Sequence, residues 1–230
     1  MYNYDNNIGN IIAPCKCCGE INEIKAWYNL NSKKDPIAKR KLIKNELFKY
    51  ECKKCGTKYL LGYEMMYHDV ENKVIIYLDP MMQYTKQIKK KIKKQKKELG
   101  KDYRFRIVKN ISSLREKAVF FEHKYDDKVI EMMVGELIVN TNYSNKDITL
   151  ERVDFNVDDD GLEVILSGVD KDNNEIEIPN YVDYNTYKVN ERNTYLLFKL
   201  KESLFIDFDW CIEQRKKNKK RIERKMRKCY

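Results

Sequence analysis

Two matched Cys-x-x-Cys-Gly units are the part of this 230-residue sequence best suited to chemistry, Cys15-Lys16-Cys17-Cys18-Gly19 and Cys52-Lys53-Lys54-Cys55-Gly56. In each unit the first and fourth residues of a tight turn can point at one ion, and the glycine that follows can adopt the positive φ that aims backbone N–H groups at the sulfurs. Two such turns supply a tetrahedral four-sulfur shell, which suits Zn²⁺ and disfavours Mg²⁺ or Ca²⁺. We therefore predict a structural zinc site formed by Cys15, Cys18, Cys52 and Cys55.

The same sulfurs leave two alternatives open. A four-sulfur cage can hold iron instead of zinc, and a Cys-x-x-Cys pair can cycle as a redox dithiol when its pKa is lowered. Cys17 could enter the ligand set, but only Cys15 and Cys18 reproduce the spacing of the second unit. Cys17, Cys211 and Cys229 are then left without a predicted role.

An enzymatic role is not favoured by the residues. A catalytic zinc keeps an open coordination position, whereas four cysteines fill the shell. The two histidines, His68 and His123, have no serine or cysteine partner that the sequence can place nearby. The predicted site is therefore structural, and the assignment leans away from an enzyme.

The composition of the chain limits the number of domains, the kind of partner and the cellular location that we expect. A chain of 230 residues with 42% hydrophobic content can form one large domain or two small ones, and we favour two. The net charge of +10 favours acidic partners, such as nucleic acid or anionic lipid, although an abundance of Lys, Asn, Ile and Tyr is also what an AT-rich genome produces. No stretch approaches the ~18 apolar residues of a membrane span, and the N-terminus does not read as a signal peptide. We therefore expect a cytoplasmic protein whose paired cysteines are kept reduced as metal ligands.

Short strands must position the two cysteine units. Residues 11–12 begin a strand before the first unit and residues 20–30 form another after it, whereas residues 48–51 and 57–66 flank the second unit. Between them, Asp35-Pro36 predicts a helix start, with Asp35 as N-cap and proline at the first helical position. This pattern predicts a zinc-ribbon-like module over residues 1–82 with a helical insertion between its cysteine units.

Further motifs accompany this arrangement. They are Pro14-Cys15, Glu46-Leu47-Phe48-Lys49-Tyr50-Glu51, Tyr67-His68-Asp69, Ile76-Tyr77-Leu78-Asp79-Pro80, Arg106-Ile107-Val108, Leu114-Arg115-Glu116-Lys117 and Tyr125–Glu131. Their order resembles the CpXC family of bacterial and archaeal proteins over residues 11–137. Members of that family carry Cys-Pro-x-Cys units, whereas this chain has Pro14 before Cys15 and Lys53 in the second unit. The resemblance implies a metal-binding domain but does not indicate that it catalyses a particular reaction.

The rest of the chain is expected to contain three segments. Residues 83–140 read as a basic linker helix over 86–97 and an αα-hairpin over 111–140 that breaks near 125–127. Residues 141–213 read as an acidic antiparallel β region, whose Asp-rich turns at 158–161 and 170–174 fit hairpin chemistry better than calcium binding. Residues 214–230 form a basic tail. The predicted fold class is α+β.

The two basic segments carry the candidate nucleic-acid contacts, Lys89, Lys90, Lys93, Lys94, Arg221 and Arg224. No aromatic residues are interleaved with the lysines of 86–97, so stacking on single-stranded bases has little support within that run. The alternatives are a solvated linker helix and a tail that is disordered or folds back on the acidic β region. We expect a binding or scaffold protein whose partner is a nucleic acid or an acidic protein.

Overall fold

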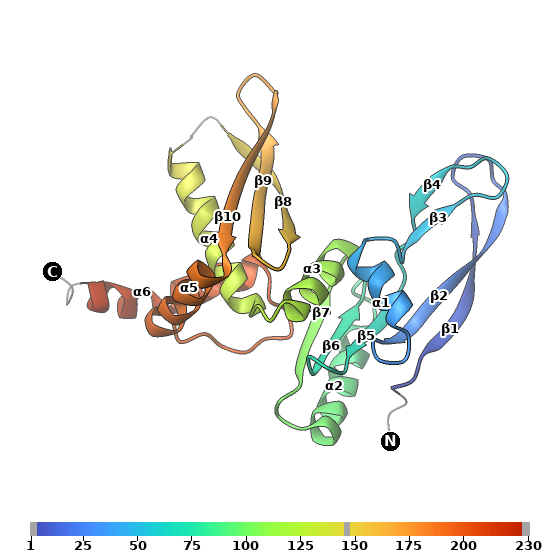
Figure 1. Cartoon of the computed structure of the whole chain (residues 1–230), viewed down its shortest axis with the longest axis horizontal. Helices are drawn as coiled ribbons and strands as arrows, with labels where there is room; N and C mark the ends of the chain where they lie inside the picture. Colours follow the sequence, from blue (N-terminus) through green and yellow to red (C-terminus); the bar gives the residue numbers. More distant parts are fainter. Residues whose placement is uncertain (1–3, 145–147, 227–230) are drawn as a thin grey trace. The chain divides into compact units, whose positions relative to one another are not determined.

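Helices and strands both occur along the chain, which confirms the predicted α+β class (Figure 1). The computed structural model describes residues 4–144 and 148–226, with only the backbone described at 142–144 and 224–226. The chain divides into two compact units, Met1–Val119 and Phe120–Tyr230. The boundary between the units lies inside helix α3 (Ile111–Glu122). The division into four segments remains a prediction from the sequence, with boundaries at 1–82, 83–140, 141–213 and 214–230.

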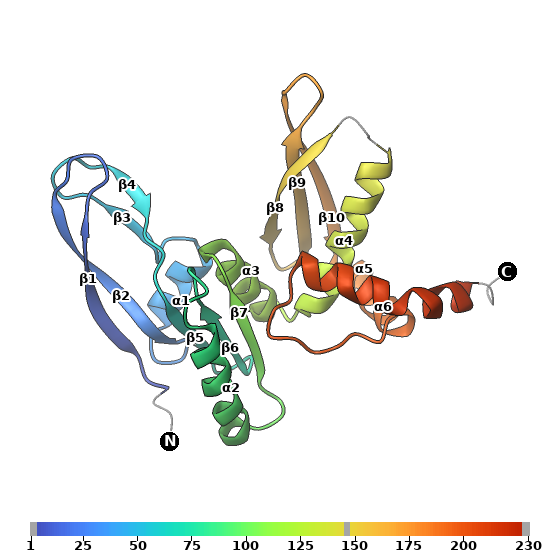
Figure 2. The same cartoon turned by 180° about the vertical axis from the view of Figure 1, so that it is seen from behind.

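A five-stranded mixed sheet organises the first unit. Its elements are β1 (Asn7–Pro14), β2 (Ile21–Asn31), α1 (Pro36–Ile43), β3 (Lys49–Glu51), β4 (Lys58–Leu60), β5 (Met65–Asp69), β6 (Val74–Leu78), α2 (Thr85–Leu99), β7 (Arg104–Val108) and α3. The strand order is β1-β2-β5-β6-β7, with parallel pairs β2–β5 and β6–β7, while β3 and β4 form a separate hairpin. All ten residues of β5 and β6 are buried, as expected for strands that are covered on both faces. Helix α1 lies in front of these strands in Figure 1, and α2 lies in front of them in the opposite view of Figure 2. The two helices therefore cover opposite faces of the sheet.

The expected helix between the cysteine units is confirmed as α1. Asp35 accepts a hydrogen bond from the backbone N–H of Ala38 (2.9 Å), and Pro36 occupies the first turn. The second carboxylate oxygen of Asp35 accepts from Nε1 of Trp27 (3.1 Å). One carboxylate therefore starts the helix and ties it to β2.

The expected lysine-rich helix is confirmed as α2. Its buried residues Ile88, Ile92 and Gln95 pack on the sheet, where the Gln95 amide oxygen accepts a hydrogen bond from the Tyr77 hydroxyl (2.8 Å). The Gln95 amide nitrogen lies 3.5 Å from the Met66 sulfur. These contacts make α2 part of the first unit.

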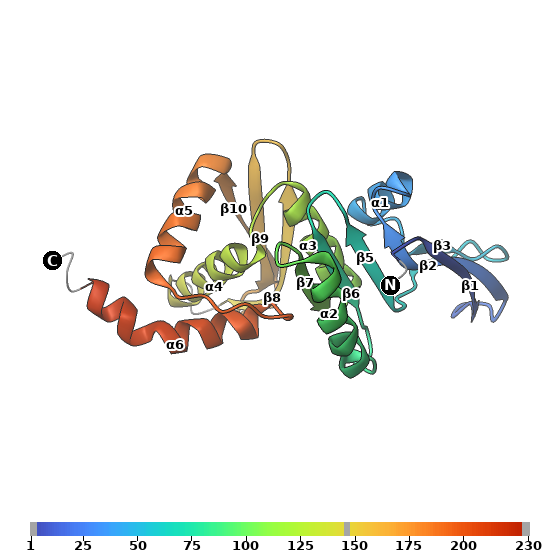
Figure 3. The same cartoon turned by 90° about the horizontal axis from the view of Figure 1, so that it is seen from below.

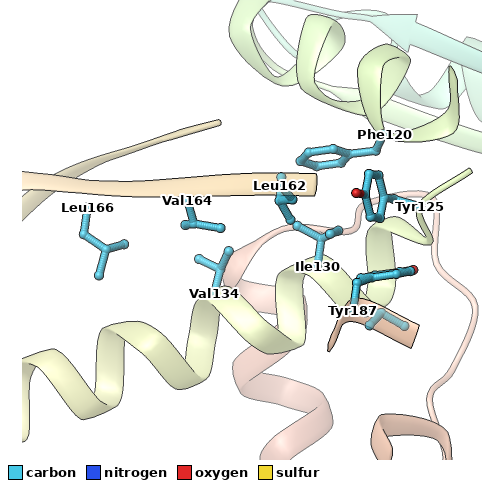
Figure 4. Close-up of a cluster of buried hydrophobic side chains, with 9 residues drawn as sticks. Phe120, Tyr125, Ile130, Val134, Leu162, Val164, Leu166 and Tyr187 are labelled. Atoms are coloured by element: carbon cyan, nitrogen blue, oxygen red, sulfur yellow. The ribbon is translucent and has the colours of Figure 1, made fainter. Parts of the chain in front are cut away.

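An antiparallel meander packs on a helix in the second unit. Its elements after α3 are α4 (Asp127–Ser144), β8 (Thr149–Val157), β9 (Gly161–Val169), β10 (Glu175–Asp183), α5 (Tyr184–Leu197) and α6 (Phe208–Met226). The order β10-β9-β8 confirms the expected meander, and α3 and α4 confirm the expected helices on either side of a break near residues 125–127. Helix α4 packs beside α5 and α6 rather than along α3, so the expected αα-hairpin is not confirmed. Figure 4 shows Ile130 and Val134 of α4 facing Leu162 and Val164 of β9, at the centre of the hydrophobic core.

Three expectations for the local structure were wrong. Residues 57–66 contain β4 and the start of β5 rather than one strand. The β-rich pattern stops at β10, because Asp183 accepts hydrogen bonds from the N–H groups of Asn185 and Thr186 and starts helix α5. Residues 215–226 are neither disordered nor folded onto the strands, because they continue α6, which packs beside α4 and α5 (Figure 3). Among the described helices, none combines the length and the apolar composition that a bilayer crossing requires.

Replacing Gly135 by alanine should destabilise the second unit. A Cβ at position 135 would lie 2.5 Å from the Cys211 sulfur, where α4 crosses α6. We expect a loss of about 1–3 kcal/mol in the free energy of unfolding from this overpacking. Denaturant unfolding measures it.

The matched control is the same change in a Cys211→Ala background. Without the sulfur, alanine should fit and add helix propensity of about 1 kcal/mol, so the effect of Gly135→Ala changes sign. An equal loss in both backgrounds would contradict the proposed clash.

Candidate metal centre

Both cysteine units are the turns of β-hairpins. The first closes the β1–β2 hairpin and the second closes the β3–β4 hairpin. Gly19 and Gly56 have φ of +73° and +69°, the left-handed conformation that glycine adopts without strain. The corresponding backbone hydrogen bonds are Cys15 N to Glu20 O (2.8 Å), Gly19 N to Cys15 O (2.9 Å), Cys52 N to Thr57 O (3.0 Å) and Gly56 N to Cys52 O (2.9 Å). The two turns thus have the same local structure.

The two turns bring four sulfurs together. The Sγ atoms of Cys15, Cys18, Cys52 and Cys55 all lie within 4.8 Å of one another. Two cross-turn pairs, Cys15–Cys55 and Cys18–Cys52, are each separated by 3.7 Å. All four cysteines are free thiols in the structure. The structure therefore places the four predicted ligands in one cluster that could hold a metal ion.

The donor set fits a tetrahedral thiolate site. Sulfurs that each lie ~2.3 Å from one zinc ion are ~3.8 Å apart along the edges of a regular tetrahedron. The 3.7 Å cross-turn distances are close to that value, whereas a disulfide would need ~2.05 Å. Four soft sulfur donors in this arrangement are typical of zinc or iron.

Hydrogen bonds and burial shift the pKa values of the clustered thiols in different directions. The hydroxyl of Thr57, 3.1 Å from the Cys55 sulfur, and the Thr57 backbone N–H lower the pKa of Cys55 to about 6. The backbone N–H groups of Cys55 and Lys54 lower the pKa of Cys52. At Cys18 the backbone N–H of Glu20 acts in the same direction, but burial and the neighbouring sulfurs raise its pKa to about 12. The metal-free cluster therefore keeps some of its protons at neutral pH.

Asn22 joins the two turns, although it was not among the residues selected from the sequence. Its side chain is 2% exposed, and its amide nitrogen donates to the Glu20 carbonyl (2.9 Å) and lies 3.6 Å from the Cys52 sulfur. Its amide oxygen accepts from the backbone N–H of Lys53 (3.5 Å). Asn22 thus connects strand β2, beside the first turn, with the second turn. Its position one residue after the start of β2 was the only available signal.

Two tyrosines of the β3–β4 hairpin lie near the cluster. Tyr50 and Tyr59 are paired across the strands with ring centroids 5.2 Å apart. Their hydroxyl oxygens are buried and have no hydrogen-bond partner among the described residues. Burial raises the pKa of both hydroxyls, and nearby cysteine thiolates raise it further. The two hydroxyl groups therefore lie close enough to the sulfur cluster to sense its charge.

The other cysteines lie outside the cluster. Cys17 is exposed on the first turn, and Cys211 is fully buried in α6 of the second unit. Cys229 lies outside the described residues. The four clustered sulfurs are thus the ones chosen by the matched spacing, without Cys17.

The candidate nucleic-acid residues fall on two helices in different units. Lys89, Lys90, Lys93 and Lys94 are exposed on α2. On α6, Arg221 donates from Nη2 to the Leu196 carbonyl (3.2 Å) near the end of α5, and only the backbone of Arg224 is described. A role in binding stays a prediction for all six residues.

The Asp-rich turns have a local explanation. Asp158 accepts hydrogen bonds from the N–H groups of Asp160 and Gly161. Asp170 accepts from the N–H groups of Asp172 and Asn174 and from the Asn174 amide. These bonds stabilise the hairpin turns.

Comparison with known proteins identifies the class of this domain. The model of the CpXC family, described as CpXC protein, matches residues 13–134, which include both cysteine turns. The chain therefore belongs to the CpXC family. Comparison with the curated proteins and with the solved structures found no match.

The lowered pKa of Cys55 predicts how the metal-free protein reacts. A thiolate that is half formed near pH 6 should be alkylated at a rate that levels off above pH 7, because the thiolate is the reactive form. Thr57→Val should move the midpoint of the pH profile upwards, since one stabilising hydrogen bond is lost. Iodoacetamide labelling followed by peptide mass spectrometry measures the rate.

The exposed Cys17 serves as the internal control, and its profile should not change in Thr57→Val. A Cys55 midpoint near that of an ordinary thiol, about 8.5, would contradict the prediction.

Proposed function

We propose that Cys15, Cys18, Cys52 and Cys55 hold one structural Zn²⁺ in a zinc-ribbon-like module formed by the β1–β2 and β3–β4 hairpins. The convergence of four sulfurs from two equivalent turns is the observation that carries the proposal. Four cysteines complete the coordination of zinc, so the ion would stabilise the fold rather than bind a substrate.

The proposed ion would fix the position of the β3–β4 hairpin. Each of these strands has only three residues, and an isolated two-stranded hairpin is marginally stable at best. Helix α1 lies between the two cysteine turns in the sequence, so the metal would close the chain segment that contains it. Binding of the metal would therefore supply part of the folding free energy of the module.

A binding or scaffold role follows as the wider proposal. Helix α2 presents Lys89, Lys90, Lys93 and Lys94 on its exposed side, and Arg221 and Arg224 lie in the basic helix α6. Such surfaces attract nucleic acids or acidic proteins, and the attraction weakens as salt is added. The metal module would then maintain the fold that carries these residues.

A thiol- or iron-dependent redox protein is the second candidate. The exposed Cys55, with its lowered pKa, is the observation that favours it, because reactive thiols combine exposure with thiolate character. The same four sulfurs would also suit iron. Metal content and visible absorption of the purified protein separate these candidates from zinc.

Elemental analysis should find about one zinc ion per chain in a colourless protein. Cys52→Ser should abolish the stoichiometric binding of zinc and lower the melting temperature, because a ligand is lost and the β3–β4 hairpin is released. Cys17→Ser is the matched control and should retain the metal, because Cys17 lies outside the cluster. Full occupancy in Cys52→Ser, or iron with visible absorption in the native protein, would overturn the proposal.

Asn22→Ala should weaken zinc binding without changing its stoichiometry. The hydrogen-bonding partners of metal ligands typically contribute 10–100-fold in affinity, and Asn22 contacts Cys52 and the second turn. Competition with a chromophoric chelator measures the dissociation constant. Asn10→Ala on β1 is the control, because the Asn10 side chain donates to the exposed carboxylate of Glu23 and, among the described residues, contacts no part of the cluster. Equal affinities of the two variants would argue against a role for Asn22.

A further inference from the structure

A groove lies between α2 and the sheet of the first unit, away from the cysteine cluster. Its volume is about 480 Å³, and its lining comes from β1, β2, β5, β6, α2 and the segments before β5 and α2. Buried Met66, Tyr77 and Ile88 are among the lining residues that give it an apolar floor. A groove of this size suits part of a flexible ligand better than a flat protein surface.

Two exposed tyrosines lie in the lining of this groove. Tyr28 is 37% exposed, and Tyr84, the residue before α2, is 43% exposed. The register pairs Asn7 with Asn29 and Ile8 with Trp27, so Tyr28 is the extra residue of a bulge. Bulges redirect side chains, and they are frequent next to binding sites.

The ring of Tyr28 has room because of a glycine on the neighbouring strand. A Cβ at Gly9 would lie only 3.0 Å from Cε2 of Tyr28. The structure thus positions two aromatic rings that are far apart in sequence beside the same groove. The lysine run itself contains no aromatic residue, so the sequence did not suggest this combination.

The remaining polar lining could recognise the edges of bases. Three side-chain amides, those of Asn7, Asn29 and Gln87, have no hydrogen-bond partner among the described residues. Each amide offers both a donor and an acceptor, which matches the edges of nucleobases. Glu64 is the acidic lining residue and could accept a hydrogen bond from an exocyclic amino group.

Positive charge continues from the groove onto the exposed side of α2. Gln87 and Lys91 line the groove, and Lys94 follows on the next turn of the same row. Farther round the helix, Lys86, Lys90, Lys93 and Lys97 are exposed and have no ion-pair partner in the described part of the chain. A 15-residue helix is ~22 Å long, enough to follow several phosphates of one strand.

We propose that this surface binds single-stranded nucleic acid, with bases stacked on Tyr28 and Tyr84 and phosphates along the lysines of α2. The combination of exposed rings, free amides and a lysine row matches the way single strands are bound without a duplex. This inference deepens the proposed binding role and rests on its polyanion-binding part. A duplex would contact the lysines but could not present its stacked bases to the groove.

Fluorescence anisotropy of the purified 230-residue protein tests the proposal. The probes are fluorescein-labelled dT12, rU12 and a mixed-sequence 12-base-pair DNA duplex, each at 50 and 200 mM salt. We expect dT12 or rU12 to bind more tightly than the duplex, with affinity that falls as salt is added. Tyr28→Leu and Tyr84→Leu should each weaken this binding about tenfold, because a stacking partner is lost.

Tyr181→Leu is the matched control, because Tyr181 is 58% exposed on β10 of the second unit. Lys94→Gln should lower the salt dependence, and Lys171→Gln in the exposed turn between β9 and β10 should leave it unchanged. Circular dichroism verifies that each variant is folded. Because Tyr28 lies in a bulge, Tyr84→Leu supplies an independent test if Tyr28→Leu alters the fold.

The outcomes separate this inference from the proposal it rests on. If single strand and duplex bind equally, and if neither tyrosine variant changes the affinity, the proposed binding of single strands at the groove is overturned. Polyanion binding would then still stand. No binding of any probe at 50 mM salt would overturn both, and the zinc measurements would remain independent of either. Binding of phosphatidylserine vesicles in place of oligonucleotides would also overturn the inference.

Discussion

The convergence of two hairpin turns on one point is the constraint on which the first unit depends. The turns have equivalent hydrogen bonds, and their four sulfurs lie within 4.8 Å of one another. The β1–β2 hairpin is joined to the five-stranded sheet, whereas β3 and β4 form a sheet of two short strands. The sulfur cluster and Asn22 therefore connect a small hairpin to a larger, better buried structure.

Local patterns predicted much of this structure. The spacing of Cys15 and Cys18 matched that of Cys52 and Cys55, and Asp35-Pro36 located α1 within a residue of its start. The two helices on either side of residues 125–127 and the meander were also predicted, because their periodicities and turn residues are local signals. These features depend on residues that are neighbours in the chain.

The missed features depend on contacts that are distant in sequence. The parallel pairs β2–β5 and β6–β7 join strands separated by long connections, and the fully buried segments 65–69 and 74–78 show no alternation that would identify a sheet face. Asn22 is an ordinary strand residue until the second turn is placed beside it. Helix α5, which Asp183 caps, was missed because it lies within residues 141–213, a stretch predicted to be a β region.

The cluster is unequal in its access to solvent. The first cysteine of each turn is almost fully buried, with Cys15 3% and Cys52 1% exposed, whereas Cys18 is partly exposed and Cys55 is exposed. A four-sulfur site of this kind has a closed side and an open side. A competing chelator would therefore first displace the more exposed sulfurs, those of Cys18 and Cys55, from a bound ion. Thermodynamic stability and the rate of exchange would then be determined by different halves of the same site.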